Sequence, residues 1–303
     1  MVSQKTHRQG QKGEVFIAVI GVTGAGKTTF ISRATGRSDL EIGHSIDSCT
    51  QEIIPVKFKL DGQTVTLIDT PGFDDSERSD ADILTLVANY MARTYEQGML
   101  LTGAIFVHPI SQQRLLGSEA RRNRLFKKIL GEDAYNRVII ATTMWNQVPE
   151  REAESRMDQR RNRNDIWGDM VKLGAKVVRH DDNTASATAI IRSLAQFESP
   201  VELQIQKELL EVGGQIGLTS AGKQLDEDLG AVISKLRNEI DNLRREGAER
   251  SEEMRELRQR LEAREEELSV VRDSNTRIIV RAIAAAIPHV AVALARSPEC
   301  VIL

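Results

Sequence analysis

Glycines, a lysine and a threonine occur near the start of the chain at the spacing that phosphate binding requires. They form the run Gly21-Val22-Thr23-Gly24-Ala25-Gly26-Lys27-Thr28, directly after the apolar residues 15–20, which predict a buried strand. Glycines let backbone N–H groups point at an anion, and the lysine adds a charge that bridges the outer phosphates. The Thr28 hydroxyl offers a hard oxygen to Mg²⁺. We therefore predict a nucleotide phosphate site made by Gly21, Thr23, Gly24, Ala25, Gly26, Lys27, Thr28 and Thr29.

Two further segments carry residues suited to a metal-bound triphosphate. The run Asp69-Thr70-Pro71-Gly72 ends an apolar stretch that we expect to neighbour the strand before the phosphate loop. Asp69 would hold a Mg²⁺-bound water, and the Gly72 N–H would contact the third phosphate. The polar residues 43–51 predict a loop from which Thr50 reaches Mg²⁺; the alternative is an ordinary hydroxyl entering the next strand. The predicted metal ligands are Thr28, Thr50 and Asp69, and the predicted catalytic residues are Lys27 and Thr50.

These motifs need a layered α/β sheet to hold them. Residues 14–200 alternate short apolar runs with amphipathic stretches, which is typical of helices packed on a mostly parallel sheet. Asp61-Gly62 is a hairpin turn signal, so we expect one antiparallel pair. Such sheets bind ligands at the carboxyl ends of their strands, where the loop after residue 20 lies. The predicted strands are 14–20, 52–60, 63–69, 102–108, 137–143 and 175–180, and the predicted helices are 27–35, 78–97, 117–131, 150–172 and 186–197.

The charge balance and the cysteine count exclude several classes of protein. The chain has 303 residues with 41 basic and 44 acidic side chains, a net charge of −3 and 4% aromatic residues. This balance indicates no general affinity for nucleic acid and no base-stacking surface. Cys49 and Cys300 are too few for a disulfide framework or a zinc site, which favours a reducing, cytoplasmic environment. Residues 1–13 are polar and basic, so we expect a flexible tail and no signal peptide there.

The sequence pattern changes after Pro200. Residues 201–228 predict a helical connector, and residues 229–273 carry apolar side chains at a seven-residue repeat. We therefore expect one long coiled-coil helix that pairs two copies of the chain in parallel. The alternative is a solvated helix folded back on the globular domain. Polar or small residues interrupt the repeat at Gly247, Arg250 and Arg264.

The last residues combine an apolar stretch with a lipidation signal. Residues 277–303 are rich in Ala, Ile and Val, but the uncharged part is interrupted by Pro288 and is too short to span a bilayer. The terminus Cys300-Val301-Ile302-Leu303 fits a prenylation signal, and nearby arginines supply a second membrane contact. We expect a lipid on Cys300 and peripheral membrane association. The alternative is a hydrophobic tail packed on a partner helix.

The phosphate loop, Thr50 and the run Asp69-Thr70-Pro71-Gly72-Phe73 together resemble a GTPase G domain, closest to the septin and immunity-associated (GIMAP) branch. The chain is more closely similar to a group of uncharacterised G-domain proteins, many from fungi. The resemblance implies the G-domain fold of the P-loop NTPases, with a mostly parallel sheet, one antiparallel strand and helices on both faces. It also implies GTP and GDP as ligands, Mg²⁺ as cofactor, and homodimers formed through the G domain.

Two positions depart from the usual GTPase pattern. The guanine-reading run Asn-Lys-x-Asp corresponds to Thr143-Met144-Trp145-Asn146, where Asn146 replaces one acceptor oxygen with an amide donor. Trp145 either packs on the base or ribose or belongs to the core. Phe73 stands where small GTPases carry the glutamine that orients the attacking water, so slow turnover is expected.

Other positions match the family less specifically. Ser186-Ala187 is similar to the pair that completes the base pocket, and His108 and Arg114 match positions near a dimer surface. The alternative for the last two is a strand-end histidine and a solvated arginine. Residues and resemblance together predict a GTP-binding protein with slow Mg²⁺-dependent hydrolysis, acting as a switch or a membrane-associated assembly factor. The alternatives are a non-hydrolysing nucleotide-binding scaffold dimerised by its coiled coil, and a P-loop protein that uses ATP.

Overall fold

The computed structural model describes residues 14–37, 53–73, 79–96, 100–112, 117–246 and 251–273. The predicted positions Thr50, Arg114 and Cys300 lie outside the described residues. The predicted tails 1–13 and 277–303 lie outside them as well.

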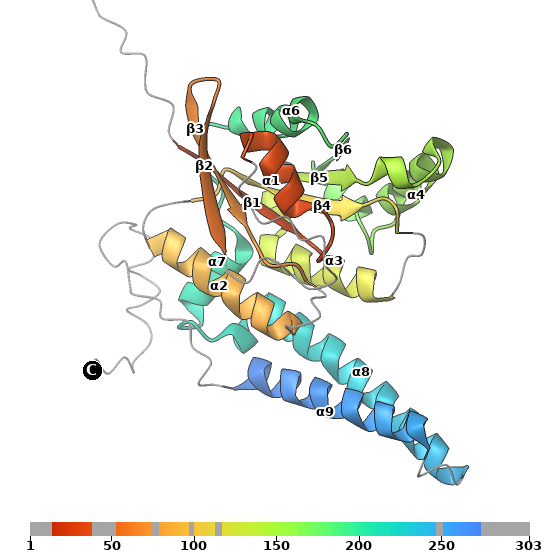
Figure 1. Cartoon of the computed structure of the whole chain (residues 1–303). Coiled ribbons are helices and arrows are strands. Elements are labelled where there is room, and N and C mark those ends of the chain that lie inside the picture. The colour runs from red at the N-terminus through yellow and green to blue at the C-terminus, as the bar shows by residue number, and fades with distance from the viewer. Residues whose placement is uncertain are drawn as a thin grey trace, which may run out of the picture.

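A six-stranded sheet forms the centre of the molecule (Figure 1). Its strands lie in the order β2-β3-β1-β4-β5-β6, and every neighbouring pair is parallel except β2 with β3. That antiparallel pair turns at Asp61 and Gly62, whose φ angles of 50° and 79° suit a tight hairpin. The predicted sheet is therefore confirmed. The strands are β1 (Val15–Gly21), β2 (Ile54–Leu60), β3 (Gln63–Asp69), β4 (Gly103–Pro109), β5 (Val138–Thr143) and β6 (Lys176–Arg179).

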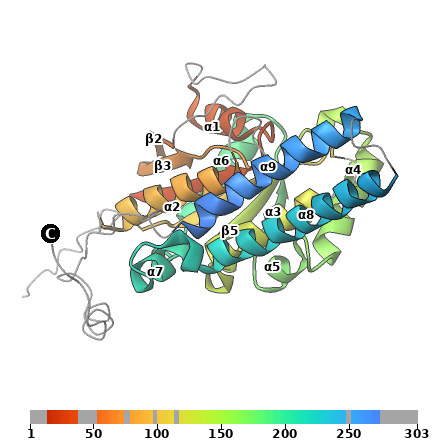
Figure 2. The same ribbon diagram turned by 90° about the horizontal axis from the view of Figure 1, so that it is seen from below.

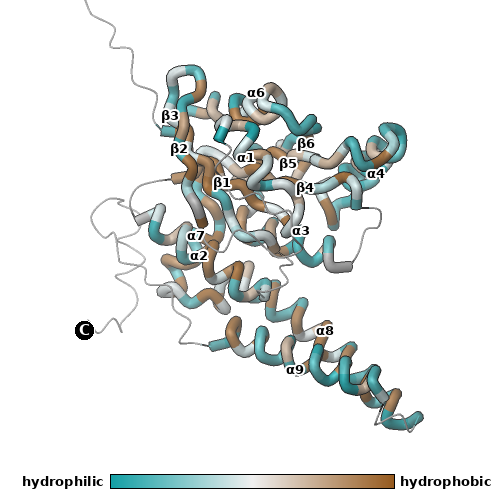
Figure 3. The backbone as a smooth tube through the Cα atoms, viewed as in Figure 1, coloured by the Kyte–Doolittle hydropathy of each residue, from teal (hydrophilic) through white to brown (hydrophobic). Residues whose placement is uncertain are grey.

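Helices cover both faces of this sheet. Alternate side chains of a strand point to opposite faces, so Ile17 and Val19 pack with α1 and α6, whereas Ala18 and Ile20 pack with α2 and α3. The unbroken apolar run of β1 is thus explained by burial on both sides, and Figure 3 shows the central strands in brown. The helices on these faces are α1 (Lys27–Thr35), α2 (Asp80–Glu96), α3 (Gly117–Leu130) and α6 (Thr184–Ala195).

One predicted helix, 150–172, is wrong, because the structure divides it into α4 (Glu150–Asn162) and α5 (Gly168–Lys172). The chain turns between them, and the Gly168 N–H donates to the Arg163 carbonyl at 2.7 Å. Trp167, at the end of this turn, is fully buried. The turn therefore places a large aromatic side chain in the core, which an unbroken surface helix would not do. Short 3₁₀ turns lie at η1 (Glu132–Arg137), η2 (Trp145–Gln147) and η3 (Ile216–Leu218).

The C-terminal part is a hairpin of two helices, so the expected single helix over 229–273 is wrong. After α7 (Gln204–Glu211), α8 spans Ser220–Arg245 and α9 spans Glu252–Arg272. The Ser251 hydroxyl accepts the Met254 N–H at 3.1 Å and so caps the start of the second helix. The two helices run antiparallel, as the ion pairs of Arg237 with Glu265 and of Arg272 with Asp226 require.

The apolar repeat is satisfied within one chain. Leu236 and Ile240 of α8 pack against Met254 and Leu257 of α9 in a cluster of their own. These are the seam positions that we expected to face a second copy, and their partners come from the folded-back helix instead. The predicted parallel seam between two copies is therefore replaced by an intramolecular one, and the alternative of a helix folded back on the globular domain describes the chain better.

The hairpin forms an additional layer outside α2 and α3 (Figure 2). Leu225 and Leu229 of α8 and Val271 of α9 belong to the same buried cluster as the inner faces of α2 and α3. The Glu267 carboxylate, only 4% exposed, accepts the N–H of Ala81 at the start of α2 at 3.3 Å. The predicted connector and the base of the hairpin thus share a core with α2 and α3 of the sheet domain. No helix in the described ranges is long and apolar enough to cross a membrane.

Candidate functional site

The phosphate loop joins the end of β1 to the start of α1, as the sequence predicts. Gly24 and Gly26 have φ angles of 74° and 92°, a left-handed conformation that favours glycine. Gly21 is needed for a different reason, because a Cβ there would lie 2.4 Å from the Val107 carbonyl oxygen of β4. An added Cβ at Gly24 or Gly26 would meet no atom within 4 Å. The two glycines therefore border open space, and their backbone is free to approach a phosphate.

The Lys27 side chain lies back along this loop. It is 7% exposed, and its Nζ donates to the carbonyl oxygens of Gly21 at 3.3 Å and Val22 at 3.0 Å. These contacts hold the ammonium group beside the bend of the loop. A bound anion would meet the ammonium and the N-terminus of α1 together.

Asp69 lies at the end of β3, directly beside β1, and contacts the start of α1. The Thr28 hydroxyl donates to Asp69 Oδ2 at 2.9 Å. The carboxylate is only 4% exposed, and its Oδ1 has no hydrogen-bond partner among the described residues. Burial raises the pKa of the Asp69 carboxyl, while the Lys27 charge and the Thr28 hydrogen bond lower it. A buried carboxylate oxygen without a partner, next to a hydroxyl, fits the oxygen ligands that Mg²⁺ prefers.

Gly72 and Phe73 are paired directly with the phosphate loop. Phe73 N donates to the Gly21 carbonyl at 3.3 Å, and Thr23 N donates to the Phe73 carbonyl at 3.1 Å. A Cβ at Gly72 would lie 2.3 Å from Thr23 N, so only glycine permits this approach. The ring of Phe73 is buried in the cluster that includes α2. The side chain after Gly72 therefore points into the core, and it has no group that positions water.

The carboxyl end of β5 is attached to the phosphate loop by Thr143. Its hydroxyl donates to the Ala25 carbonyl at 2.8 Å. We did not predict this positioning role, although Thr143 is the first residue of the run that corresponds to the base-reading motif. The contact fixes the distance between the turn after β5 and the loop that would hold the phosphates.

Trp145 and Asn146 follow in the η2 turn and differ in exposure. Trp145 is 7% exposed, packs with Ile110 and Ala153, and donates its indole N–H to the Thr142 carbonyl at 3.1 Å. The structure thus places Trp145 in a small core, which is one of its two predicted locations. Asn146 is exposed at the end of the sheet that carries the phosphate loop.

Ser186 and Ala187 lie inside α6 and not in the loop before it. The Ala187 N–H already donates to the Asn183 carbonyl at 3.1 Å, within the first turn of the helix. Ser186 Oγ lies 2.8 Å from His180 Nδ1, so this serine holds the end of β6 against α6. Asp181 and Asp182 follow the carboxyl end of β6, and Asp182 pairs with Arg33 of α1 at 3.1 Å.

His108 is a core residue in the structure and is not at a dimer surface. It is 2% exposed at the end of β4, and its ring meets Trp167 edge-on at a centroid distance of 5.0 Å. Glu119 and Arg160 are buried beside it and form an ion pair at 3.0 Å. Burial, together with the charges of Arg160 and Arg122, lowers the pKa of His108 well below 6.5. The alternative of a strand-end histidine is the better description.

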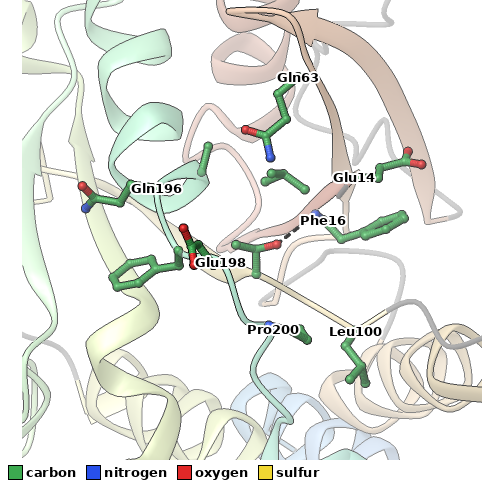
Figure 4. Close-up of a pocket in the computed structure, with 11 residues that line it drawn as sticks. Glu14, Phe16, Gln63, Leu100, Gln196, Glu198 and Pro200 are labelled. Carbon is green, nitrogen blue, oxygen red and sulfur yellow. Dashed lines mark hydrogen bonds between the residues drawn. The ribbon is translucent and has the colours of Figure 1, made fainter. Parts of the chain in front are cut away.

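A cavity of about 470 Å³ lies at the opposite end of the sheet (Figure 4). Glu14 and Phe16, at the amino end of β1, line it together with Gln63 and Glu198. A hydrogen bond from Phe16 N to Thr102 Oγ1, at 3.3 Å, crosses its wall. The phosphate loop follows the carboxyl end of β1, so this cavity is separate from the candidate site.

Comparison with known proteins finds sequence similarity to GTPases. A family profile described as 50S ribosome-binding GTPase matches residues 16–139. GTP-binding protein A of Dictyostelium discoideum is 26% identical over 140 residues, which are 46% of this chain and 30% of that protein. GTPase Der of Rhodopirellula baltica is 38% identical over 68 residues, which are 22% of this chain and 15% of that protein. The match thus spans less than a third of either relative.

Solved structures agree on the fold. Toc33 of Arabidopsis thaliana, in its complex with Mg²⁺ and GMPPNP, aligns with a TM-score of 0.50 at 13% identity, over 62% of this chain and 88% of that chain. The same protein with GDP and Mg²⁺ aligns with the same TM-score over 61% of this chain. The strand order, the phosphate loop and the adjacent Asp-x-x-Gly run are all in the positions that this fold gives them. The described residues therefore have the α/β fold of P-loop GTPase G domains.

Proposed function

We propose that this chain binds GTP and GDP together with Mg²⁺ and hydrolyses GTP slowly. The observation that carries the proposal is the buried Asp69 carboxylate, hydrogen-bonded to Thr28 and with its second oxygen unpartnered among the described residues, beneath the glycine-rich loop. The names of the relatives support it, since they include a GTP-binding protein and a GTPase. The Toc33 structures that share the fold contain Mg²⁺ with GDP or GMPPNP.

Each residue of the site has a role in this proposal. The backbone N–H groups of Gly24 and Gly26 would contact the β-phosphate, and Lys27 would neutralise the outer phosphates. Thr28 and Asp69 would hold the metal, and Thr50 is the further ligand that the sequence predicts. Mg²⁺ itself would neutralise charge that develops between the outer phosphates. Gly72 is already beside Thr23 and so within reach of the same phosphate.

Slow turnover follows from Phe73. Its buried ring occupies the position after Gly72 and offers no hydrogen bond to an attacking water. Water must then be oriented by Thr50, by the backbone or by a residue of a partner molecule. A non-hydrolysing scaffold is the second candidate, and the same buried Phe73 favours it. A protein that uses ATP is the third, because Asn146 does not secure the choice of guanine.

Self-association and membrane contact are also part of the proposal. A structure of the chloroplast translocon proteins atToc33 and psToc159 is described as showing that dimerization is important for their GTPase activity. A dimer through the G domain is therefore the arrangement that we propose for this chain, as a switch or an assembly factor. Three further proposals rest on the sequence alone. They are the assignment to the septin and GIMAP branch, the lipid on Cys300, and a cytoplasmic location with recruitment to membranes.

Nucleotide titration of a lysine variant tests the phosphate site. Lys27→Ala is expected to lower GTP affinity at least about 100-fold, because the charge at the phosphates is lost. Lys176→Ala is the matched control, since Lys176 is an exposed residue of β6. Calorimetry with GTP and Mg²⁺ measures both affinities. Unchanged GTP binding by Lys27→Ala would refute the site.

Hydrolysis needs a separate measurement. Phosphate release per molecule should rise with protein concentration if a second G domain completes the site. Release that is slow but constant supports an intrinsic GTPase, and no release at any concentration supports the scaffold.

A further inference from the structure

Asn146 is held in a fixed place while its side chain remains available. The turn that carries it is anchored by Thr143, whose hydroxyl binds the Ala25 carbonyl, and by the buried indole of Trp145. Asn146 itself is exposed, and its amide has no hydrogen bond to another described residue. A rigid turn that presents a free amide beside the phosphate loop is suited to reading the edge of a nucleobase.

The amide group differs from a carboxylate in what it can read. A carboxylate accepts two hydrogen bonds side by side, which matches the N1–H and the 2-amino group of guanine. Asn146 accepts one hydrogen bond through Oδ1 and donates one through Nδ2. When Oδ1 accepts the purine N1–H, Nδ2 faces the substituent at C2. Two donors then meet in guanine, whereas a donor meets an acceptor in xanthine, which carries oxygen at C2.

We propose that Asn146 makes this G domain prefer xanthosine nucleotides to guanosine nucleotides. This inference rests on the proposed nucleotide binding and adds the identity of the base. GTP remains a ligand, because the phosphate loop binds the triphosphate in the same way for every base. The two bases differ by one hydrogen bond, which is matched in xanthine and mismatched in guanine.

The carboxylates of Glu150 and Asp181 are oriented toward an arginine. The Arg179 guanidinium lies 4.4 Å from the centre of the Trp145 ring and therefore borders the same turn. It is ion-paired with both Glu150 and Asp181. One oxygen of each carboxylate is held on this guanidinium. Asn146, in the position of the base-reading carboxylate, is therefore the group to which we assign the contact at C2.

Calorimetric titration of the full chain with XTP, GTP, ITP and ATP tests the inference. In the presence of Mg²⁺, XTP should bind about 10- to 100-fold more tightly than GTP, with ITP between them because it has no polar group at C2. Asn146→Asp should reverse the order of GTP and XTP, since both acceptors are restored for guanine. Asn238→Asp is the control with the same change of charge, at an exposed position of α8, and should leave the order unchanged.

The outcomes separate this inference from the proposal on which it rests. GTP binding as tightly as XTP to the wild-type chain overturns the inference and leaves nucleotide binding intact. Tighter binding of ATP than of XTP overturns it too, because the amide then reads the N1 and the 6-amino group of adenine. If no nucleotide binds, the proposed function itself fails.

Discussion

The Asp69 carboxylate keeps one oxygen buried and unpartnered among the described residues, and that arrangement costs stability unless a ligand uses the oxygen. Burial raises the pKa of Asp69, whereas the Lys27 charge and the Thr28 hydroxyl oppose the shift. In the free protein, the desolvation of the ionised Asp69 side chain therefore costs more free energy than its contacts with Lys27 and Thr28 return. A bound cation would supply the missing interaction.

Asp69→Asn should therefore separate stability from function. Without nucleotide, the variant is expected to be more stable than the wild type by about 1 kcal/mol, because an amide replaces a desolvated charge. The dependence of nucleotide affinity on Mg²⁺ should disappear, since the amide does not hold the metal-bound water as a carboxylate does. Urea unfolding measures the first effect, and calorimetry with and without Mg²⁺ measures the second. A variant that keeps the full Mg²⁺ dependence would show that Asp69 is not a metal-site residue.

At the scale of elements, a buried charged cluster holds β4, α3 and α4 together. His108 of β4 lies 3.6 Å from Glu119 of α3, which pairs with Arg160 of α4. Arg160 also donates to the Gln112 carbonyl just after β4, at 3.1 Å. Neutral His108 suits this cluster, because burial and the charges of Arg160 and Arg122 lower its pKa well below 6.5.

Stability should consequently fall as the pH drops below about 6.5. The folded chain keeps His108 neutral while the unfolded chain binds a proton there, so the loss approaches about 1.4 kcal/mol per pH unit. Between pH 6.5 and 5, the wild type should lose up to about 2 kcal/mol more than His108→Gln, which cannot titrate. Urea unfolding across this range compares the two slopes, with His180 present in both proteins. Equal slopes would contradict the assignment of a lowered pKa to His108.

Some parts of the fold were predictable and others were not, because their sequence signals differ in kind. The six strands are unbroken or alternating apolar runs, and such runs report burial directly. The seven-residue repeat of the C-terminal part indicates a buried helix–helix seam. It does not indicate whether the partner helix belongs to the same chain or to a second copy. Met254 and Leu257 have the same pattern whether they face a second copy or Leu236 and Ile240 of the same chain. The two are distinguished by the end of α8 at Arg245 and the start of α9 at Glu252, and the sequence sign of this break was the interruption of the repeat at Gly247 and Arg250.

The candidate site was predictable in a similarly uneven way. The loop, Thr28 and Asp69 were identified because phosphate and Mg²⁺ restrict both residue type and spacing. The hydroxyl of Thr143 was missed, since its partner Ala25 lies far away in sequence and a threonine after a strand has no distinctive pattern. The burial of Trp145 was left open for the same reason: it depends on Ile110 and Ala153, which only the fold brings together.

At the scale of the whole molecule, the phosphate loop and the C-terminal hairpin belong to one continuous body. Phe73 is paired with the loop through Gly21 and Thr23, and its ring packs in the cluster that contains Ala81 of α2 and Val271 of α9. Glu267 of α9 accepts the backbone N–H of Ala81. The outer half of the hairpin has a separate cluster around Leu257. The base of the hairpin should therefore unfold with the G domain, whereas the outer half should open alone.

Two truncations within α9 distinguish these halves. Val271→Ala removes methyl groups from the shared cluster and should lower the stability of the whole domain by about 2 kcal/mol. Leu257→Ala removes more volume, but from the outer cluster, and should change the stability of the G domain by less than about 0.5 kcal/mol while the end of the hairpin opens. The only two tryptophans, Trp145 and Trp167, lie outside the hairpin, so their fluorescence during urea unfolding reports the G domain. Hydrogen exchange of the amides near Leu257 reports the hairpin. If Leu257→Ala lowers the tryptophan-detected stability as much as Val271→Ala does, the hairpin and the G domain unfold as a single cooperative unit along its whole length, and the division into two clusters has no energetic meaning.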